Sequence, residues 1–281
     1  MRSSRSSDAP MLAKQRQARI LTEIRRHGGA RVTDLTTLLG VSDMTIRRDL
    51  EELTASGSVH KVHGGAVLNA AASSEPGFEA KSGLEQPAKS AIADAAARLI
   101  RPGSAIAVSA GTTTWALAQH VAGIAGLTIV TNSTAVAEQI GGADPRSDAT
   151  LILTGGVRTP SAALVGPVAD QALGMLHVDQ LFLGVHGMDA AAGFTTPNLA
   201  EAQTNRALIA MADQVIVCAD STKWGSVGLA SFAPLSAADV LITDQDLPAD
   251  AVALLRDTVG ALELVPVDRA EVDDPGAART S

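Results

Sequence analysis

The sequence has few of the residues on which several protein classes depend. Among its 281 residues, aromatic residues make up 2%, tyrosine is missing, and there is one cysteine, Cys218. Proteins that hold single-stranded nucleic acid usually stack its bases on aromatic rings, so this composition argues against such a binder. One cysteine excludes a disulfide framework. Because Cys218 lies in the apolar run 215–219, we expect a buried thiol in the core.

Long apolar runs and targeting signals are missing as well. Hydrophobic residues make up 46% of the chain, but Gly, Thr and Asp interrupt the apolar runs before they are long enough to span a membrane. Residues 1–10 are polar and lack the apolar middle of a secretion signal. The six histidines are scattered without the spacing of metal ligands. We therefore expect a cytoplasmic protein with no metal, no cofactor and no membrane contact.

A stretch near the amino terminus has the pattern of two short helices joined by a sharp turn. The first covers residues 32–39, and Gly40 permits the change of direction. Ser42 is placed to cap the second helix, its hydroxyl accepting from the amide of Thr45, and Gly57 is placed to end it. Apolar residues recur at helical spacing in both segments. The expected inward faces are Leu35, Leu38 and Leu39 in the first helix, and Met44, Ile46, Leu50 and Leu53 in the second.

A longer helix before this pair and a basic ribbon after it complete a winged helix-turn-helix pattern. Residues 15–27 can bury Ile20, Leu21 and Ile24 against the pair, and residues 59–65 alternate valine with histidine and lysine before a Gly-Gly turn. In such motifs the second helix enters the major groove, where arginine pairs with guanine and hydroxyls reach phosphates or bases. A solvated helix face is the ordinary alternative for adjacent arginines. The candidate DNA-binding residues are Ser42, Thr45, Arg47, Arg48, Lys61, His63 and Gly64.

The distribution of charge agrees with this division. Residues 1–66 hold 11 basic and 7 acidic side chains, a net charge of +4, whereas the remainder of the chain has a net charge of −12. A basic end on an acidic body is typical of a DNA-binding regulator whose larger domain does not itself bind phosphates of the duplex.

The remainder of the chain alternates short strand-like runs with helical segments. Helices are expected at 89–100 and 115–121. Such alternation predicts parallel strands with crossover helices on both faces, so the fold class is α/β, an open α/β sheet domain behind the winged helix-turn-helix domain. The expected strands are 105–108, 128–131, 150–153, 180–183, 215–219 and 240–243. The expected domains are a disordered 1–10, the DNA-binding domain 11–68, a linker 69–84 anchored at most by Phe78, the α/β domain 85–268 and a disordered tail 269–281.

Five loops that follow the expected strands are rich in glycine and hydroxyl side chains. In an open α/β sheet, ligands bind outside the carboxyl ends of the strands. The loop 109–114 opens a helix, so its amides and the glycine can hold an anion such as phosphate, although Thr112 as a simple helix cap is the alternative. The other loops have structural alternatives too, as helix caps or plain turns. The candidate effector-binding residues are Gly111, Thr112, Thr113, Thr114, Asn132, Gly155, Gly156, His186, Glu201, Asp220 and Lys223.

Two sets of motifs resemble those of one known family. Residues 41–50 and 62–66 resemble the amino-terminal signature of the DeoR family of bacterial transcription regulators. The resemblance extends over roughly residues 12–268. Its further matching pieces are 110–114, 131–133, 153–156, 178–179, 182–187, Asn198 with Glu201, and 219–223.

This resemblance implies a sensor domain similar in fold to sugar-phosphate isomerases, a sugar phosphate as effector, and self-association. The chain departs from the family pattern at Ser109, where many members have aspartate, and at Asn205, where many have lysine. Related isomerases carry acidic residues where this chain has residues 185–187, so no paired acid for proton transfer is evident, with Glu201 the remaining candidate base.

The sequence therefore predicts a sequence-specific transcriptional regulator, a repressor of carbohydrate metabolism genes that is not an enzyme. Its expected partners are a double-stranded DNA operator, a phosphorylated sugar and further copies of the chain. The alternative is a sugar-phosphate isomerase-like enzyme with an appended DNA-binding module. Turnover of a sugar phosphate would distinguish the enzyme from the regulator.

Overall fold

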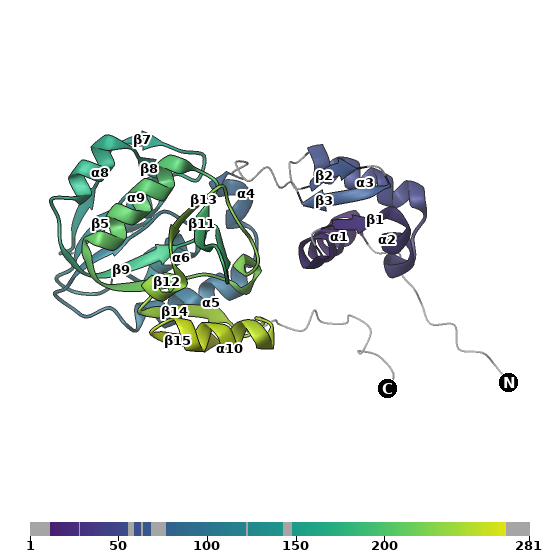
Figure 1. Ribbon diagram of the computed structural model, residues 1–281. Coiled ribbons are helices and arrows are strands. Elements are labelled where there is room, and N and C mark those ends of the chain that lie inside the picture. The colour runs from purple at the N-terminus through teal and green to yellow at the C-terminus, as the bar shows by residue number, and fades with distance from the viewer. Residues whose placement is uncertain are drawn as a thin grey trace, which may run out of the picture. The chain divides into compact units, whose positions relative to one another are not determined.

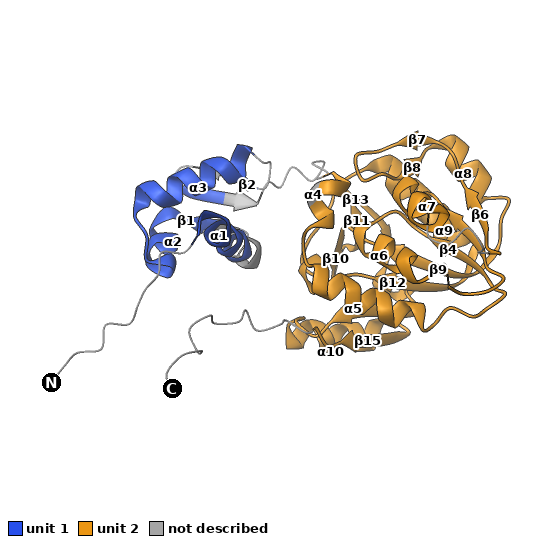
Figure 2. Ribbon diagram, turned by 180° about the vertical axis from the view of Figure 1, so that it is seen from behind, with its two compact units in different colours: residues 1–74 blue, residues 75–281 orange. Residues whose placement is uncertain are grey.

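The computed structural model describes residues 12–27, 29–55, 59–62, 64–68, 77–121, 123–142 and 148–267 (Figure 1). The chain divides into two compact units, residues 1–74 and 75–281 (Figure 2). The segments predicted to be disordered, 1–10 and 269–281, lie outside the described residues, as do Gly57 and His63. None of the described helices is long and apolar enough to cross a membrane.

The first unit is a three-helix bundle with a small antiparallel sheet of strand order β1-β3-β2. Its core is apolar and continuous, with Ile20 and Ile24 of the first helix packed with Leu35, Ile46 and Leu50 of the next two. The winged helix-turn-helix predicted from the sequence is confirmed in outline, with one strand more than expected. The elements are α1 (Ala13–His27), β1 (Gly29–Arg31), α2 (Val32–Leu39), α3 (Asp43–Ala55), β2 (Val59–Val62) and β3 (Gly65–Leu68).

Two of the predicted inward-facing residues are exposed instead. Met44 is 80% exposed. The buried face of α3 runs through Ile46, Leu50 and Leu53, and Met44 lies two residues, about 200°, from Ile46 around the helix axis, so it points away from that face. Leu38 is 56% exposed, because the buried side of the short α2 passes through its residues 32 and 35.

The second unit is built on a seven-stranded parallel sheet of order β15-β14-β12-β9-β4-β5-β6. The α/β fold class is confirmed, and three strands have the predicted ends. β15 was not predicted, and the ends of the other three differ from their predicted bounds by one to three residues. The strands are β4 (Ala105–Val108), β5 (Thr128–Thr131), β6 (Thr150–Leu153), β9 (Val178–Gly184), β12 (Ala212–Cys218), β14 (Val240–Asp244) and β15 (Ala261–Val265).

Helices cover both faces of this sheet, and each face has its own core. Adjacent residues of a strand point to opposite faces, so Ile106 packs under α5, α6 and α7, whereas Ala107 belongs to the cluster that includes α8, α9 and α10. Cys218 lies in the first of these cores as a buried thiol, as predicted, and burial raises its pKa to about 12. The helices are α5 (Gln86–Ala97), α6 (Thr112–Val121), α7 (Thr134–Gly141), α8 (Pro167–Leu173), α9 (Leu199–Ala210) and α10 (Ala249–Thr258).

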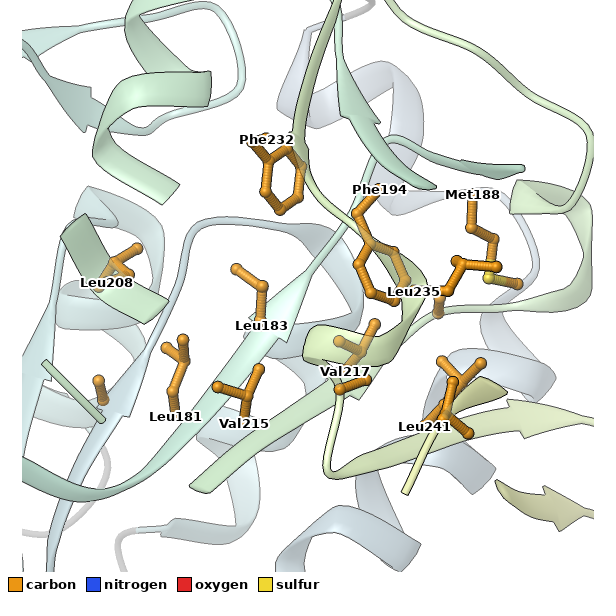
Figure 3. Close-up of a cluster of buried hydrophobic side chains, with 14 of the residues drawn as sticks. Leu181, Leu183, Met188, Phe194, Leu208, Val215, Val217, Phe232, Leu235 and Leu241 are labelled. Atoms are coloured by element: carbon orange, nitrogen blue, oxygen red, sulfur yellow. The ribbon is translucent and has the colours of Figure 1, made fainter. Parts of the chain in front are cut away.

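A second, antiparallel sheet closes the core on the α9 side. Its order is β10-β11-β13, and it places Phe194 against Phe232, with ring centroids 6.3 Å apart and the rings stacked (Figure 3). Both rings lie above Leu183 and Val217 of the main sheet, in the same buried cluster (Figure 3). The three strands are β10 (Gly187–Asp189), β11 (Gly193–Thr196) and β13 (Ala230–Ala233), and a separate two-stranded ribbon is formed by β7 (Val157–Arg158) and β8 (Leu164–Val165).

The stretch predicted to be a linker, 69–84, contains a helix in its second half. α4 (Phe78–Ser82) belongs to the second unit, and α5 begins at Gln86, three residues before its predicted start. The ring of Phe78 meets the indole of Trp115 edge-on, with centroids 6.0 Å apart. This aromatic contact supplies the packing that a five-residue helix needs, and it joins residues far apart in the sequence.

Candidate functional sites

The start of α3 has the cap that the sequence predicted. The amide of Thr45 donates to Ser42 Oγ at 3.3 Å, and the hydroxyls of the two residues are 2.9 Å apart. Gly40 ends α2 in the left-handed conformation, with φ of 65°, which glycine adopts without strain. The turn and the cap therefore fix the direction in which α3 leaves α2.

The two arginines of α3 are exposed and lie beside carboxylates one turn away. The guanidinium of Arg47 bonds the carboxylate of Asp43, which raises the pKa of Arg47. Arg48 is 83% exposed, with its Nε 3.7 Å from Glu52 Oε1. Exposed ion pairs of this kind are weak, so both guanidinium groups can exchange a carboxylate for a phosphate or a guanine edge.

Asp49, next to these arginines, has a structural role that the sequence analysis missed. Its side chain is 3% exposed and accepts from the guanidinium of Arg16 on α1, with Nη2 3.0 Å from Oδ1. Gln17 donates to the same oxygen at 3.4 Å. The signal in the sequence was a carboxylate on the buried face of the helix, beside Leu50 and three residues after Ile46. Asp49 therefore holds α3 against α1.

The wing is an antiparallel pair of strands with glycines at its turn. Lys61 lies in β2 opposite Ala66 of β3, and Gly64 has φ of 79°. A Cβ atom on Gly65 would lie 2.3 Å from the carbonyl oxygen of Ala30, so the close approach of β1 requires glycine there. Gly65 is therefore needed for the packing of the wing against β1.

The carboxyl edge of the seven-stranded sheet holds all five predicted loops. Since its strands are parallel, the loops after β4, β5, β6, β9 and β12 leave from the same edge. The strand order reverses between β4 and β9, because the chain continues from β4 to β5 on one side and returns to β9 on the other. Ligands of open α/β sheets bind at such a reversal. The loops 109–114 and 184–186 lie on its two sides.

The loop after β4 has the form of an anion site. α6 begins at Thr112, and the first amides of a helix have no partners within it. Gly111 has φ of 153° and would place a Cβ atom 3.0 Å from Thr114 Oγ1. The hydroxyl of Thr114 itself donates to the carbonyl of Gly111 at 3.0 Å, and Thr113 is buried. The backbone amides, more than the three threonine hydroxyls, are therefore the groups that this loop offers to a ligand.

Ser109 and Asn132 join neighbouring loops to each other. The hydroxyl of Ser109 accepts from the amide of Gly184 at 2.9 Å, across the reversal from β4 to β9. Asn132 Oδ1 accepts from the amide of Ala110 at 3.0 Å, and its Nδ2 donates to the carbonyl of Leu164. Both side chains are buried. Ser109 thus links the ends of two neighbouring strands.

The glycines after β6 form a turn with two left-handed residues. Gly155 has φ of 74° and Gly156 has φ of 116°. A Cβ atom on Gly156 would lie 2.6 Å from the carbonyl oxygen of Val165 in β8. This close approach favours the plain-turn interpretation for Gly156. Arg158, just beyond, is exposed and its Nε lies 3.4 Å from Thr134 Oγ1.

Glu201 is fully engaged by hydroxyl groups. Its Oε1 accepts from Thr159 at 2.8 Å and from Ser161, and its Oε2 accepts from Thr196 at 2.9 Å. Asn198 caps the helix that carries it, accepting from the amides of residues 200 and 201. These hydrogen bonds join Glu201 to the residues that follow β7 and to β11. Glu201 positions the segment 157–163 beside β11.

The loop after β12 carries a carboxylate, Asp220, and an ammonium group, Lys223. His186 lies on the loop after β9, the neighbouring strand of the sheet. Asp220 caps a short 3₁₀ turn, and its other oxygen, Oδ2, is 4.0 Å from Lys223 Nζ. Asp220 is 1% exposed, and among the described residues Oδ2 has no hydrogen-bond partner. Burial, together with the charges of Lys81 and Lys223, lowers the pKa of His186 to about 4. His186 is therefore neutral at pH 7 and able to donate one hydrogen bond and accept another.

Lys89 is a further charged residue at this edge, and the sequence analysis placed it only as the start of a helix. It is 3% exposed, and its Nζ donates to the carbonyls of Lys81 at 2.7 Å and Leu84 at 2.5 Å. Burial lowers its pKa to about 8, with Asp220 raising it and Lys223 lowering it. The spacing of the sequence could have indicated its burial, because Lys89 lies three, four and seven residues before the buried residues 92, 93 and 96 and so shares their face of α5.

A hollow of about 620 Å³ lies at the opposite, amino-terminal edge of the sheet. Its lining includes Asp179, Asp213 and Asp239. Asp179 accepts from the amide of Ala105 at 2.8 Å, and Asp239 from that of Val215 at 2.7 Å, so both serve to hold the starts of strands. An acidic lining disfavours an anionic ligand, and the carboxyl edge remains the candidate site. Within the described residues, no group of three or more His, Cys, Asp or Glu could hold a metal ion.

Comparison with known proteins gives a consistent result over most of the chain. Residues 16–72 match the DeoR-like helix-turn-helix domain, and residues 85–245 match the DeoR C terminal sensor domain. The chain belongs to the DeoR family. It is accordingly a DNA-binding transcriptional regulator with a sensor domain, and not an enzyme.

Individual relatives in this family align over nearly their whole length. The chain is 35% identical to a putative aga operon transcriptional repressor of Escherichia coli O157:H7, over 86% of this chain and 90% of that protein. It is 36% identical to the HTH-type transcriptional regulator GlpR of Haloferax volcanii, over 85% of this chain and 93% of that protein. Among solved structures, a D-ribose-5-phosphate isomerase in complex with phospho-erythronic acid is similar at a TM-score of 0.37 and 16% identity, over 50% of this chain and 54% of that one.

Proposed function

We propose that this DeoR-family protein is a repressor of carbohydrate metabolism genes that binds its operator as a homo-oligomer and responds to a phosphorylated sugar. The sugar phosphate binds at the carboxyl edge of the seven-stranded sheet, across the reversal between β4 and β9. A dimer or larger assembly presents two copies of α3 to paired half-sites of double-stranded DNA, since operator symmetry follows protein symmetry.

The observation that carries the sensor part is the set of groups at this edge. The start of α6 offers backbone amides behind Gly111, and Lys223 adds a positive charge. Asp220 keeps one buried oxygen available as an acceptor. Amides and ammonium groups bind a phosphoryl group, and a carboxylate oxygen accepts from a sugar hydroxyl. A phosphorylated sugar has both kinds of group.

The proposed ligand contacts are fewer than those expected from the sequence. Direct contacts come from Gly111, Thr112, Thr113, His186, Asp220 and Lys223. Thr114, Asn132, Gly156 and Glu201 position the loops, since their polar groups or packing are already used within the protein. The proposed DNA contacts come from Thr45, Arg47 and Arg48 of α3 and from the wing around Lys61.

Gel-shift titration with the DNA upstream of the protein's own gene region tests both halves. We expect specific retardation that one or more phosphorylated sugars reverse and that the unphosphorylated sugars leave unchanged. Retardation that no phosphorylated sugar alters would remove the sensor half of the proposal. Absence of specific retardation, with the protein folded, would remove the operator half.

A further inference from the structure

The hollow at the amino-terminal edge of the seven-stranded sheet, called the amino-edge hollow below, is lined by more acidic than basic side chains. Its volume is about 620 Å³, which is the size of a small-molecule site. Its charged lining consists of three aspartates and one arginine, a net charge of −2, and these residues are Asp179, Asp213, Asp239 and Arg101. This charge favours a cationic ligand over an anionic one.

The three aspartates lie at the starts of three adjacent strands. Asp179 and Asp213 are at the same level of β9 and β12, because the residues on either side of each are paired in register, and Asp239 immediately precedes β14. β9, β12 and β14 are neighbours in the sheet, and neighbouring strands lie about 4.8 Å apart. The carboxylates therefore form a row, and within the described residues no group of this kind could hold a metal ion.

Each carboxylate keeps an oxygen that the protein does not use. Oδ2 of Asp179 accepts from the amide of Ala105, and Oδ2 of Asp239 accepts from the amide of Val215. In the part of the chain that the structure describes, Oδ1 of both residues forms no hydrogen bond, and the exposed side chain of Asp213 forms no hydrogen bond or ion pair. These oxygens are available to a ligand.

A buried amide in the lining of the amino-edge hollow also lacks a partner. Gln180 is 4% exposed and lines the hollow. Its Nε2 donates to Gln214 Oε1 at 3.0 Å, whereas its own Oε1 is buried and has no hydrogen-bond partner among the described residues. Turning both amides over would leave Nε2 of Gln180 unpaired in place of Oε1, so this pair leaves Gln180 unsatisfied in either orientation. A ligand that donates to Oε1 removes the cost of a buried polar atom without a partner.

We propose that the amino-edge hollow binds a linear polyamine, whose ammonium groups contact the row of aspartates and donate a hydrogen bond to Gln180. The nitrogens of such a molecule are separated by propyl or butyl chains, which are comparable in length with the spacing between strands. A row of separated carboxylates therefore matches a row of separated ammonium groups better than it matches one metal ion. This site lies at the opposite edge of the sheet from the proposed sugar-phosphate site and adds a second ligand to the proposed function.

Calorimetric titration of the full chain with spermidine tests this site. DNA is left out of the experiment, because its phosphates bind polyamines themselves. We expect a single saturable site per chain that binds spermidine more tightly than putrescine, which has fewer ammonium groups, or Mg²⁺ at the same ionic strength. Absence of saturable binding would overturn the proposal. Binding of Mg²⁺ as tight as that of spermidine would also overturn it, since charge alone would then explain the binding.

Asp213→Asn distinguishes this site from general attraction to an acidic surface. The side chain of Asp213 is exposed and bonds no other described residue, so its loss should leave the fold intact. We expect the affinity for spermidine to fall about fivefold. Asp250→Asn is the matched control, because Asp250 is exposed in the first turn of α10 and does not line the hollow. Equal losses in the two variants would show that the binding is not specific.

Two further variants test the contacts within the amino-edge hollow. Gln180→Met removes the unpaired oxygen and keeps an unbranched side chain, and we expect affinity for spermidine about tenfold weaker with no loss of thermal stability. Arg101→Gln removes the one positive charge of the lining and should tighten spermidine binding about twofold or more, a gain that a folding defect cannot produce. Wild-type affinity in folded Gln180→Met, or no gain in Arg101→Gln, would contradict the proposed site.

Discussion

At the scale of single residues, the motif of arginines and aspartate in α3 divides into two roles. Arg47 and Arg48 are exposed and paired with surface carboxylates, whereas Asp49 is buried against Arg16. Neighbouring positions on a helix point about 100° apart, so a run of three charged residues faces both solvent and the core. The proposed DNA contacts therefore come from the arginines, and the packing role belongs to the aspartate.

Arg47→Ala and Lys61→Ala are expected to affect DNA binding differently. If Arg47 contacts a base, its loss costs about 1–3 kcal/mol and relaxes the preference at one operator position. Loss of a phosphate contact at Lys61 weakens binding to all sequences alike and lowers the dependence on salt. Binding isotherms on operator and mutated operator at several salt concentrations distinguish the two. Equal losses on every sequence for both variants would show that Arg47 reads no base.

Asp49→Ala is expected to destabilise the first unit by roughly 3 kcal/mol, because it removes the buried carboxylate that joins α3 to Arg16 of α1. Denaturant unfolding of the isolated residues 12–74, if they fold alone, or of the full chain measures this. Asp43→Ala is the matched control, since its pair with Arg47 is exposed and contributes little. Equal stability of the two variants would contradict the role assigned to Asp49.

His186 makes folding sensitive to acid. Its pKa is about 4 in the folded protein and 6.5 as the unperturbed value. Between these values the unfolded chain binds a proton that the folded one does not, so the stability that neutral His186 contributes is present above pH 6.5 and is lost as the pH falls toward 4. His186→Gln should remove about 2 kcal/mol of that pH dependence. Unfolding curves at pH 7 and pH 4.5 compare the two proteins, and identical pH profiles would show that His186 titrates normally.

At the scale of elements, the loop between β4 and α6 depends on one glycine. Gly111 has a backbone conformation that other residues adopt with strain, and a side chain there would approach Thr114. Gly111→Ala should therefore weaken binding of the sugar phosphate by roughly tenfold, which corresponds to about 1.4 kcal/mol. Gly123→Ala is the control, since nothing lies within 4 Å of its Cβ position and no left-handed conformation is required. Calorimetric titration measures both, and unchanged affinity in Gly111→Ala would place the anion elsewhere.

At the scale of the whole molecule, the two functions are linked by thermodynamics. If the sugar phosphate lowers the affinity for operator by a given factor, operator must lower the affinity for the sugar phosphate by the same factor. We expect titrations of the full chain with and without operator to give equal factors, within about 5–150-fold for a typical coupling. Unequal factors would mean that the oligomeric state changes during the experiment.

The sequence indicated the local structure well where one short segment determines it. The cap at Ser42, the turn at Gly40 and the ends of β4, β5 and β6 depend on neighbours in the chain. Met44 was placed inward because apolar character was given more weight than its angular position on α3, and its exposure corrects that. β15 and α4 were missed because their stability comes from packing against distant segments, a neighbouring strand and the ring of Trp115.

The same contrast applies to the candidate site. The alternation of strands and helices by itself determined a parallel sheet, and hence one edge where the glycine- and hydroxyl-bearing loops must end. Only the tertiary structure decided which of their polar groups already form hydrogen bonds within the protein, as at Asn132 and Glu201. It also decided which groups can still accept a hydrogen bond from a ligand, as at Asp220. It alone brought Lys89 to that edge, because hydrogen bonds and desolvation depend on neighbours in space, and residue type and spacing do not specify those neighbours.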